Sequence, residues 1–439
     1  MEQTVVRIIF WGEPKGVSKW PTIDFDAEKR AEKIFKILKE NLRGFKFVGG
    51  NLVKNSEEAE ELLKEIGQEG EVCSVIFHLS SGWHDSLKIM EKLPTVVICD
   101  PFLWGYAGMT VHSVNLRKRN IRGFIVSSSR WSDVFKAFRV IKAYDSLCNA
   151  KILVIGKHVL SARREAYEKA VKRIGGEIKF IDFSELREAF QKIDIQKAER
   201  TADDLIAEAN KIVEPSREEI VKSVRLYYAL KNLCSKYGVS GVTIDCLGGF
   251  YRGELPAYPC VAFALLDNEG EIMTACECDV DSLLTKIAMK EIAERPGFIS
   301  EPAVDTSRDV AIYSHCVSAT RMYGFSRPPE EYWIRSHAED NKGVCLQVLF
   351  KGVIPVTVTK LLPVEKRILL LKGELMGHEE AEGGCRNKAV VKVADAQTLI
   401  DEWQHNWHRV LFYGDWTKEL KWLSRLIGFS LCMEPGGDT

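Results

Sequence analysis

The sequence lacks any run long enough to cross a membrane. No stretch of about 18 consecutive apolar residues occurs, and the start, MEQTVVRIIFWGE, has no basic segment followed by a long apolar one. Charge bias is missing as well, because 61 Lys and Arg stand against 62 Asp and Glu without a long block of one sign. We therefore expect a soluble, unprocessed cytoplasmic protein whose partners include neither membrane nor nucleic acid.

Phosphate-binding glycine motifs are also missing. GKHVLSARRE (156–165) has neither the G-x-x-x-x-G-K-[ST] nor the G-x-G-x-x-G spacing, and GGFYRG (248–253) follows its strand without opening a clear helix. Cys276 and Cys278 have C-x-C spacing, and a zinc site built on such a pair needs a second pair of cysteines or histidines. The sequence contains no second close cysteine pair. The twelve cysteines instead lie in apolar runs such as VCSVIF and TVVIC, which favours reduced core residues over a disulfide framework.

What the chain does contain is repeated alternation of strands and helices. Its 439 residues exceed the roughly 250 to 300 at which a single core stops growing, so several domains are expected. The pattern predicts an α/β fold with two flavodoxin-like or Rossmann-like parallel sheets, followed by a small antiparallel, β-barrel-like domain with a terminal helix. The predicted domains are 1–148, 149–295 and 296–439. Strands of the first domain are predicted at 4–12, 45–49, 72–78, 95–99 and 123–127.

The stretch IMTACECDVDSLL (272–284) ends a predicted strand and begins a predicted helix. Glu277 and Asp279 then lie at the carboxyl end of a strand, where α/β proteins bind ligands. Asp279 or Asp281 can alternatively serve as a helix cap, whereas Glu277 precedes the helix and is the stronger candidate for chemistry.

Two later stretches supply acids and histidines. EPAVDTSRDVAIYSHC (301–316) contains Glu301, Asp305 and Asp309 before His315, and the aspartates can also be turn formers. HNWHRVLFY carries His405 and His408, of which we expect one to point into a site. GHEEAEGGC (377–385) is typical of a solvated loop between strands.

Four segments taken in order, ACECDVDSLLT, VDTSRDVAIYSHC, GGCRNKAVVKV and HNWHRVLFYGDW, resemble the carboxyl-terminal half of the L-fucose and L-arabinose isomerase family. The resemblance implies two α/β domains followed by a barrel-like domain. By position, Glu277 matches the first metal-binding and catalytic glutamate, Asp305 the second such acid and His408 the metal-binding histidine. Glu301 competes with Asp305, and Cys278 replaces the usual glycine.

The function implied by this resemblance is metal-dependent aldose–ketose isomerisation of a free sugar through an enediol, with Mn²⁺ or another divalent cation. Two carboxylates and an imidazole suit such an ion and can also move the protons. The resemblance further implies a homo-oligomer, a trimer or hexamer, with shared active sites. Candidate substrate-binding residues are His315, Trp83, Trp104 and Tyr106.

Two other functions stay open. Cys278 in place of glycine is compatible with a sugar-binding or regulatory protein of the same fold that has an altered activity. A thiolate zinc hydrolase using Cys276 and Cys278 is the third reading, and it would lose its zinc when either cysteine is replaced.

Overall fold

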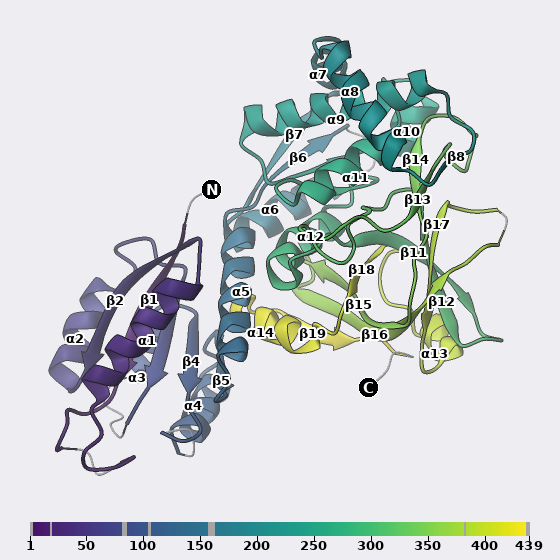
Figure 1. Ribbon diagram of the computed structural model, residues 1–439. Coiled ribbons are helices and arrows are strands. Elements are labelled where there is room, and N and C mark those ends of the chain that lie inside the picture. Colours follow the sequence, from purple (N-terminus) through teal and green to yellow (C-terminus); the bar gives the residue numbers. More distant parts are fainter. Residues whose placement is uncertain are drawn as a thin grey trace. The chain divides into compact units, whose positions relative to one another are not determined.

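The computed structural model describes residues 3–17, 20–80, 86–103, 107–156, 163–381 and 383–435 (Figure 1). The chain divides into two compact units. Unit 1 contains the residues up to Asp145 together with Glu419–Phe429, and unit 2 contains Ser146–Lys418 and the residues from Ser430 onward. Among the described residues, no helix combines the length and the apolar character that a bilayer crossing requires.

Unit 1 is built on a five-stranded sheet in which every pairing is parallel. The strand order, β2-β1-β3-β4-β5, is that of a flavodoxin-like doubly wound sheet. The five predicted strands are present, as β1 (Thr4–Trp11), β2 (Phe45–Val53), β3 (Cys73–His78), β4 (Thr95–Cys99) and β5 (Gly123–Ser127). Its helices are α1 (Ala27–Asn41), α2 (Ser56–Glu65), α3 (Ser86–Lys92), α4 (Ala107–Lys118) and α5 (Trp131–Cys148), which continues into unit 2.

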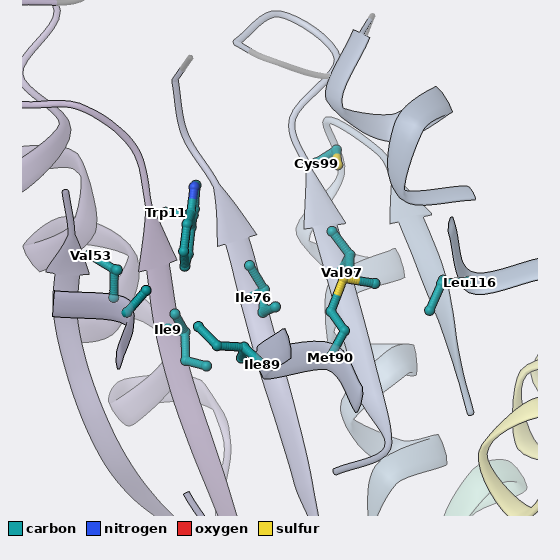
Figure 2. Packing of buried hydrophobic residues seen from close by; sticks show 10 residues of the cluster. Ile9, Trp11, Val53, Ile76, Ile89, Met90, Val97, Cys99 and Leu116 are labelled. Atoms are coloured by element: carbon teal, nitrogen blue, oxygen red, sulfur yellow. The ribbon is translucent and has the colours of Figure 1, made fainter. Parts of the chain in front are cut away.

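Apolar side chains of three neighbouring strands hold this sheet against its helices. Ile9, Ile76 and Val97 lie on β1, β3 and β4, and Met90 of α3 packs on them; all four are almost fully buried (Figure 2). Burying a side chain of this size contributes about 1.5 to 3 kcal/mol. The β-branched runs of the sequence are apolar on both sides, as expected for strands of a parallel sheet whose two faces are covered by helices.

Unit 2 begins with a second parallel sheet. Its order is β10-β9-β6-β7, so in chain order the strands run 2-1-3-4, as in the first four positions of the first sheet. The strands are β6 (Lys151–Ile155), β7 (Glu177–Ile181), β9 (Gly241–Ile244) and β10 (Met273–Ala275). The helices of this part are α6 (Arg164–Ile174), α7 (Phe183–Gln191), α8 (Ile195–Glu208), α9 (Arg217–Tyr237), α10 (Cys246–Tyr251), α11 (Cys260–Glu269) and α12 (Val280–Ala293).

A closed antiparallel barrel of six strands follows in the same unit. The order is β15-β18-β11-β12-β17-β16, and the pairing of β15 with β16 closes it. Closure removes the open edges that an antiparallel sheet would otherwise expose. The barrel strands are β11 (Phe298–Asp305), β12 (Val310–His315), β15 (Ile354–Leu362), β16 (Arg367–His378), β17 (Asn387–Lys392) and β18 (Arg409–Tyr413).

Smaller elements complete both units. A three-stranded sheet joins β8 (Lys211–Ile212), β13 (Tyr332–Arg335) and β14 (Cys345–Val348), and β19 (Ser430–Met433) runs parallel to β16. The short helix α13 spans Ala396–Asp401. Helix α14 (Thr417–Ile427) lies largely in unit 1, where Trp422 stacks on Phe124 with ring centroids 4.8 Å apart.

Candidate metal centre

The turn that joins β10 to α12 carries the first residue of the site. Glu277 and Cys278 have φ values of 58° and 54°, in the left-handed region that residues other than glycine seldom occupy. Two backbone hydrogen bonds hold the turn: the Cys278 amide donates to the Ile244 carbonyl and the Asp279 amide to the Cys276 carbonyl, each at 3.0 Å. The turn is therefore fixed from both sides, and it presents Glu277 beyond the end of the parallel sheet.

Glu277, His315 and His408 form a three-residue cluster with the spacing of metal ligands. One ligand atom from each lies within 4.8 Å of the other two. His315 Nε2 is 3.7 Å from Glu277 Oε1, and His408 Nε2 is 3.8 Å from Glu277 Oε2. Three elements meet here, because His315 ends strand β12 and His408 immediately precedes β18.

His408 is the most informative member of the cluster. Its side chain is 2% exposed, and its Nε2 atom has no hydrogen-bond partner among the described residues. A buried ring nitrogen normally has a partner, and leaving it without one costs free energy. This Nε2 atom faces the Glu277 carboxylate and the His315 imidazole, so it is positioned as a metal ligand.

Asp279 and Lys360 fix the other side of the His408 ring. His408 Nδ1 lies 3.0 Å from Asp279 Oδ2, and the fully buried Lys360 Nζ lies 2.7 Å from the same oxygen. Burial alone would raise the pKa of Asp279, but the Lys360 ammonium and His408 outweigh it and hold that pKa well below its usual value. An ionised Asp279 can only accept a hydrogen bond, so it orients the His408 ring through Nδ1 and turns Nε2 toward Glu277.

Glu277 has opposing influences on its charge. Burial raises its pKa, whereas the nearby His315 and His408 lower it, and the net effect is a pKa below the usual glutamate value. Glu277 is therefore ionised at neutral pH. In that form it can bind a cation or accept a proton.

The two competing acids of strand β11 lie in different places. Glu301 Oε1 is 3.6 Å from His408 Nε2, and its side chain is 46% exposed. Asp305 lies four residues farther along the strand, about 13 Å away at 3.3 Å per residue. It accepts hydrogen bonds from the amide and hydroxyl of Ser307 and so forms the turn into β12. Glu301 is thus the acid of β11 that approaches His408 in the structure, and a metal-binding role for Asp305 stays a prediction.

The remaining candidate residues fall into three groups. His405 points away from the cluster, 2.7 Å from Glu365 and 3.5 Å from Asp281, so only one of the two carboxyl-terminal histidines enters the site, as expected. Asp279 does cap α12, by accepting from the Ser282 amide, and it also binds His408. The candidate sugar-binding residues Trp83, Trp104 and Tyr106 lie outside the described residues.

Sequence reasoning missed Lys360 and the second contact of Asp279. The signal for Lys360 was a lone lysine within the apolar strand run VTVTKLL, where a charged side chain needs a buried partner. Nine of the twelve cysteines are buried, in agreement with the expectation of core residues.

A cavity of about 260 Å³ opens onto the cluster. Glu277, Glu301 and His315 lie in its wall, together with the aromatic side chains of Phe250 and Trp407. The cavity provides room for a small ligand beside the carboxylates. Because its acids and imidazoles converge on one point, the arrangement can hold a divalent cation and move protons next to it.

Comparison with known proteins adds no name to this site. No family model matches the chain, and no curated protein matches it. One solved structure, described as "XylFII molecule", covers 58% of this chain and 86% of its own at 13% sequence identity; its TM-score is 0.16, and a likeness this low carries no argument.

Proposed function

We propose that this protein is a metal-dependent aldose–ketose isomerase that acts on a free sugar through an enediol. The single observation that carries the proposal is the convergence of Glu277, His315 and His408, with the buried Nε2 atom of His408 facing the two other ligands. The segments that resemble the L-fucose and L-arabinose isomerase family supply the reaction type, and the geometry of the cluster is compatible with it.

The donor set fits a divalent cation. Carboxylate oxygens and imidazole nitrogens together suit Mn²⁺ and similar ions, whereas a set of thiolates would favour zinc. Glu277, His315 and His408 would hold the ion, and Glu301, whose Oε1 atom lies 3.6 Å from His408 Nε2, is the acid beside them. When bound, such an ion would supply Lewis-acid polarisation of the carbonyl group of the substrate.

The residues of the chain have separate roles in this proposal. Glu277, ionised at neutral pH, takes the proton from one sugar carbon and returns it to the next. Glu301, at the more exposed side, exchanges the proton of the sugar hydroxyl. Asp279 does not touch the sugar; it orients His408 and is therefore a positioning residue.

The departure from the family pattern, Cys278 in place of glycine, lies in the turn between β10 and α12. Cys278 occupies the position where the family has glycine, and its φ of 54° is one that glycine adopts without strain. Cys278 is 2% exposed, and its thiol lies 3.9 Å from the Ile155 carbonyl rather than in the cavity. Cysteine in place of glycine at position 278 thus adds no side chain to the cavity wall. This supports the proposal that the activity is retained.

The proposal extends to partners and location. By the same resemblance, we propose a cytoplasmic homo-oligomer, a trimer or hexamer, in which an amino-terminal domain completes the sugar site of a neighbouring subunit. Trp83, Trp104 and Tyr106 are the aromatic candidates for that contact. Gel filtration with light scattering measures the oligomeric state directly.

The test is an assay of purified protein with Mn²⁺ against pentoses, hexoses and 6-deoxyhexoses. We expect aldose–ketose exchange with at least one sugar, one bound Mn²⁺ per chain, and loss of both in Glu277→Gln, since positioned acid–base catalysis alone contributes about 10²- to 10⁴-fold. Asp305→Asn is the matched control and should retain both. Sugar binding without exchange would overturn the isomerase proposal in favour of a binding or regulatory protein.

A further inference from the structure

The loop of residues 402–408, between α13 and β18, carries the candidate metal ligand His408 and contains neither helix nor strand. A single buried side chain holds the backbone of this ligand loop. It belongs to Arg409, the first residue of β18, which is 0% exposed. Its Nη1 atom donates to the carbonyls of Asn406 at 3.0 Å and His408 at 2.9 Å, and its Nη2 atom donates to the Gln404 carbonyl. Alternate carbonyl groups of the loop thus accept from one guanidinium group.

The remaining donors of Arg409 bind the carboxylate of Glu434, which follows strand β19. Arg409 Nε lies 3.1 Å from Glu434 Oε1 and 3.0 Å from Oε2, and Nη2 lies 2.5 Å from Oε1. The Glu434 side chain is 1% exposed, so the ion pair is shielded from water. A guanidinium group has five N–H donors, and each of those on Arg409 has an acceptor. The group is therefore fixed in both position and orientation.

Two further contacts restrict Arg409. Its guanidinium group lies over the ring of Trp403, 4.1 Å from the ring centroid. Its backbone pairs with Ser300 of β11, and the next residue of that strand is Glu301. The backbone of Arg409 is thus next to the strand that carries Glu301, while its side chain holds the loop that carries His408.

Stability by itself does not explain this buried ion pair. Taking two charges out of water is costly, and apolar side chains of similar volume often stabilise a protein as well or better. Apolar side chains cannot, however, donate to the carbonyl groups of a loop that lacks the hydrogen bonds of a helix or strand. Arg409 does so at three positions of the ligand loop, the last of which is His408 itself.

We propose that Arg409 and Glu434 are positioning residues of the metal centre, which hold the backbone of the ligand loop so that His408 Nε2 faces Glu277. Asp279 orients the His408 ring through Nδ1, whereas the Arg409–Glu434 pair fixes the backbone from which that ring extends. Metal ligands have to be held within about 0.5 Å of their productive geometry, and an irregular loop needs such support. The inference rests on the proposed metal centre and does not depend on the reaction assigned to it.

Arg409→Lys and Glu434→Gln test the proposal through the Mn²⁺ affinity of the folded protein, measured by calorimetric titration. Lysine keeps the charge but carries its donors on a single atom, so it cannot bind Glu434 and the loop carbonyls together. Glutamine keeps the shape of Glu434 but removes the charge that pairs with the guanidinium group. We expect the Mn²⁺ affinity to fall about 10- to 100-fold in both variants, as for other residues that orient a metal-binding histidine. Glu434→Asp retains the charge and should show a smaller loss.

A buried pair of the same kind in unit 1 provides the matched control. Arg7 Nε lies 2.6 Å from Glu71 Oε1, and the two side chains are 3% and 0% exposed. Glu71→Gln should destabilise the fold, because it also leaves a buried guanidinium group without its partner. It should leave the Mn²⁺ affinity unchanged. Denaturant unfolding of both glutamine variants separates a general loss of stability from a loss of positioning.

A spectroscopic measurement follows His408 directly. Pulsed electron paramagnetic resonance of bound Mn²⁺ detects the ¹⁴N nuclei of coordinated imidazoles. We expect the signal of both His315 and His408 in the unmodified protein and in Glu71→Gln. At saturating Mn²⁺, Glu434→Gln should lose part of this signal and approach the spectrum of His408→Ala. A loss of stability without displacement of the ligand would not change the spectrum.

The outcomes distinguish this proposal from that of the isomerase. Unchanged Mn²⁺ affinity and an unchanged ¹⁴N signal in folded Glu434→Gln or Arg409→Lys would overturn the positioning role. Equal losses of affinity in Glu434→Gln and Glu71→Gln would overturn it as well, because the effect would then be one of stability alone. Mn²⁺ binding that depends on Glu434 without any sugar exchange would overturn the reaction and leave the positioning role intact. Absence of Mn²⁺ binding in the unmodified protein would overturn both.

Discussion

The two parallel sheets of this protein share the strand order 2-1-3-4 and differ in what covers their carboxyl ends. In unit 1, His78 ends β3, Asp100 follows β4 and Ser128 follows β5, next to a small cavity of about 60 Å³. In unit 2, Glu277 follows β10 and meets His315 at the end of β12 and His408 just before β18. The described part of the chain contains one cluster with metal-ligand spacing, and it lies in unit 2.

The polar groups of the first sheet are engaged with one another. His78 Nδ1 lies 2.9 Å from His112 Nε2, and Arg30 lies 3.3 Å from Asp100. Burial lowers the pKa of His112 to about 4, so this imidazole is neutral at pH 7. The carboxyl end of a parallel sheet thus offers a location for chemistry, but convergent ligands occur here only where other elements of unit 2 supply histidines.

The largest expected effect is on stability, and it tests whether metal binding in unit 2 depends on the parallel sheet of unit 1. Ile76→Ala removes a fully buried side chain from β3 and should lower the free energy of unfolding by about 2 to 5 kcal/mol. The Mn²⁺ affinity of the folded protein should not change, because all three ligands of the metal cluster belong to unit 2. Denaturant unfolding and calorimetric titration measure the two quantities. A fall in Mn²⁺ affinity together with the loss of stability would show that the two sheets are coupled.

The next effect concerns the orientation of His408. Asp279→Asn removes the charge that accepts the Nδ1 proton and leaves the buried Lys360 without its ion-pair partner. We expect Mn²⁺ affinity to fall about 10- to 100-fold, as for other residues that orient a metal-bound histidine. Asp100→Asn at the first sheet is the matched control and should leave the affinity unchanged. Equal affinities in both variants would contradict the positioning role.

The smallest effect separates the two acids of β11. Glu301→Gln should weaken Mn²⁺ binding, because Glu301 lies 3.6 Å from His408 Nε2. Asp305→Asn alters only a turn on the surface, so its effect on stability should stay within about 0.5 kcal/mol and the affinity should be that of the unmodified protein. If Asp305→Asn weakened Mn²⁺ binding more than Glu301→Gln did, Asp305 would be the second acid.

Much of the fold could be predicted because periodicity is a local property. The β-branched runs that form β1 to β5 are visible as strands, and their alternation with helices implies a parallel sheet. Glu277 could be found in the same way, from a strand that changes into a helix. Asp305 was chosen over Glu301 because both lie in one strand, and sequence spacing alone does not tell which end of that strand reaches the histidines.

The alternating α/β elements, the change to β strands after residue 296 and the acid that follows β10 can all be found in the amino-acid sequence alone. Two features of the site could be found only in the three-dimensional structure: the approach of Glu301 to His408, and the contacts of Asp279 with His408 and Lys360. Backbone periodicity acts over a few residues and can therefore be recognised in a short stretch of sequence. The convergence of ligands depends instead on how a closed barrel brings distant segments together, such as those that contain His315 and His408, which are more than 90 residues apart.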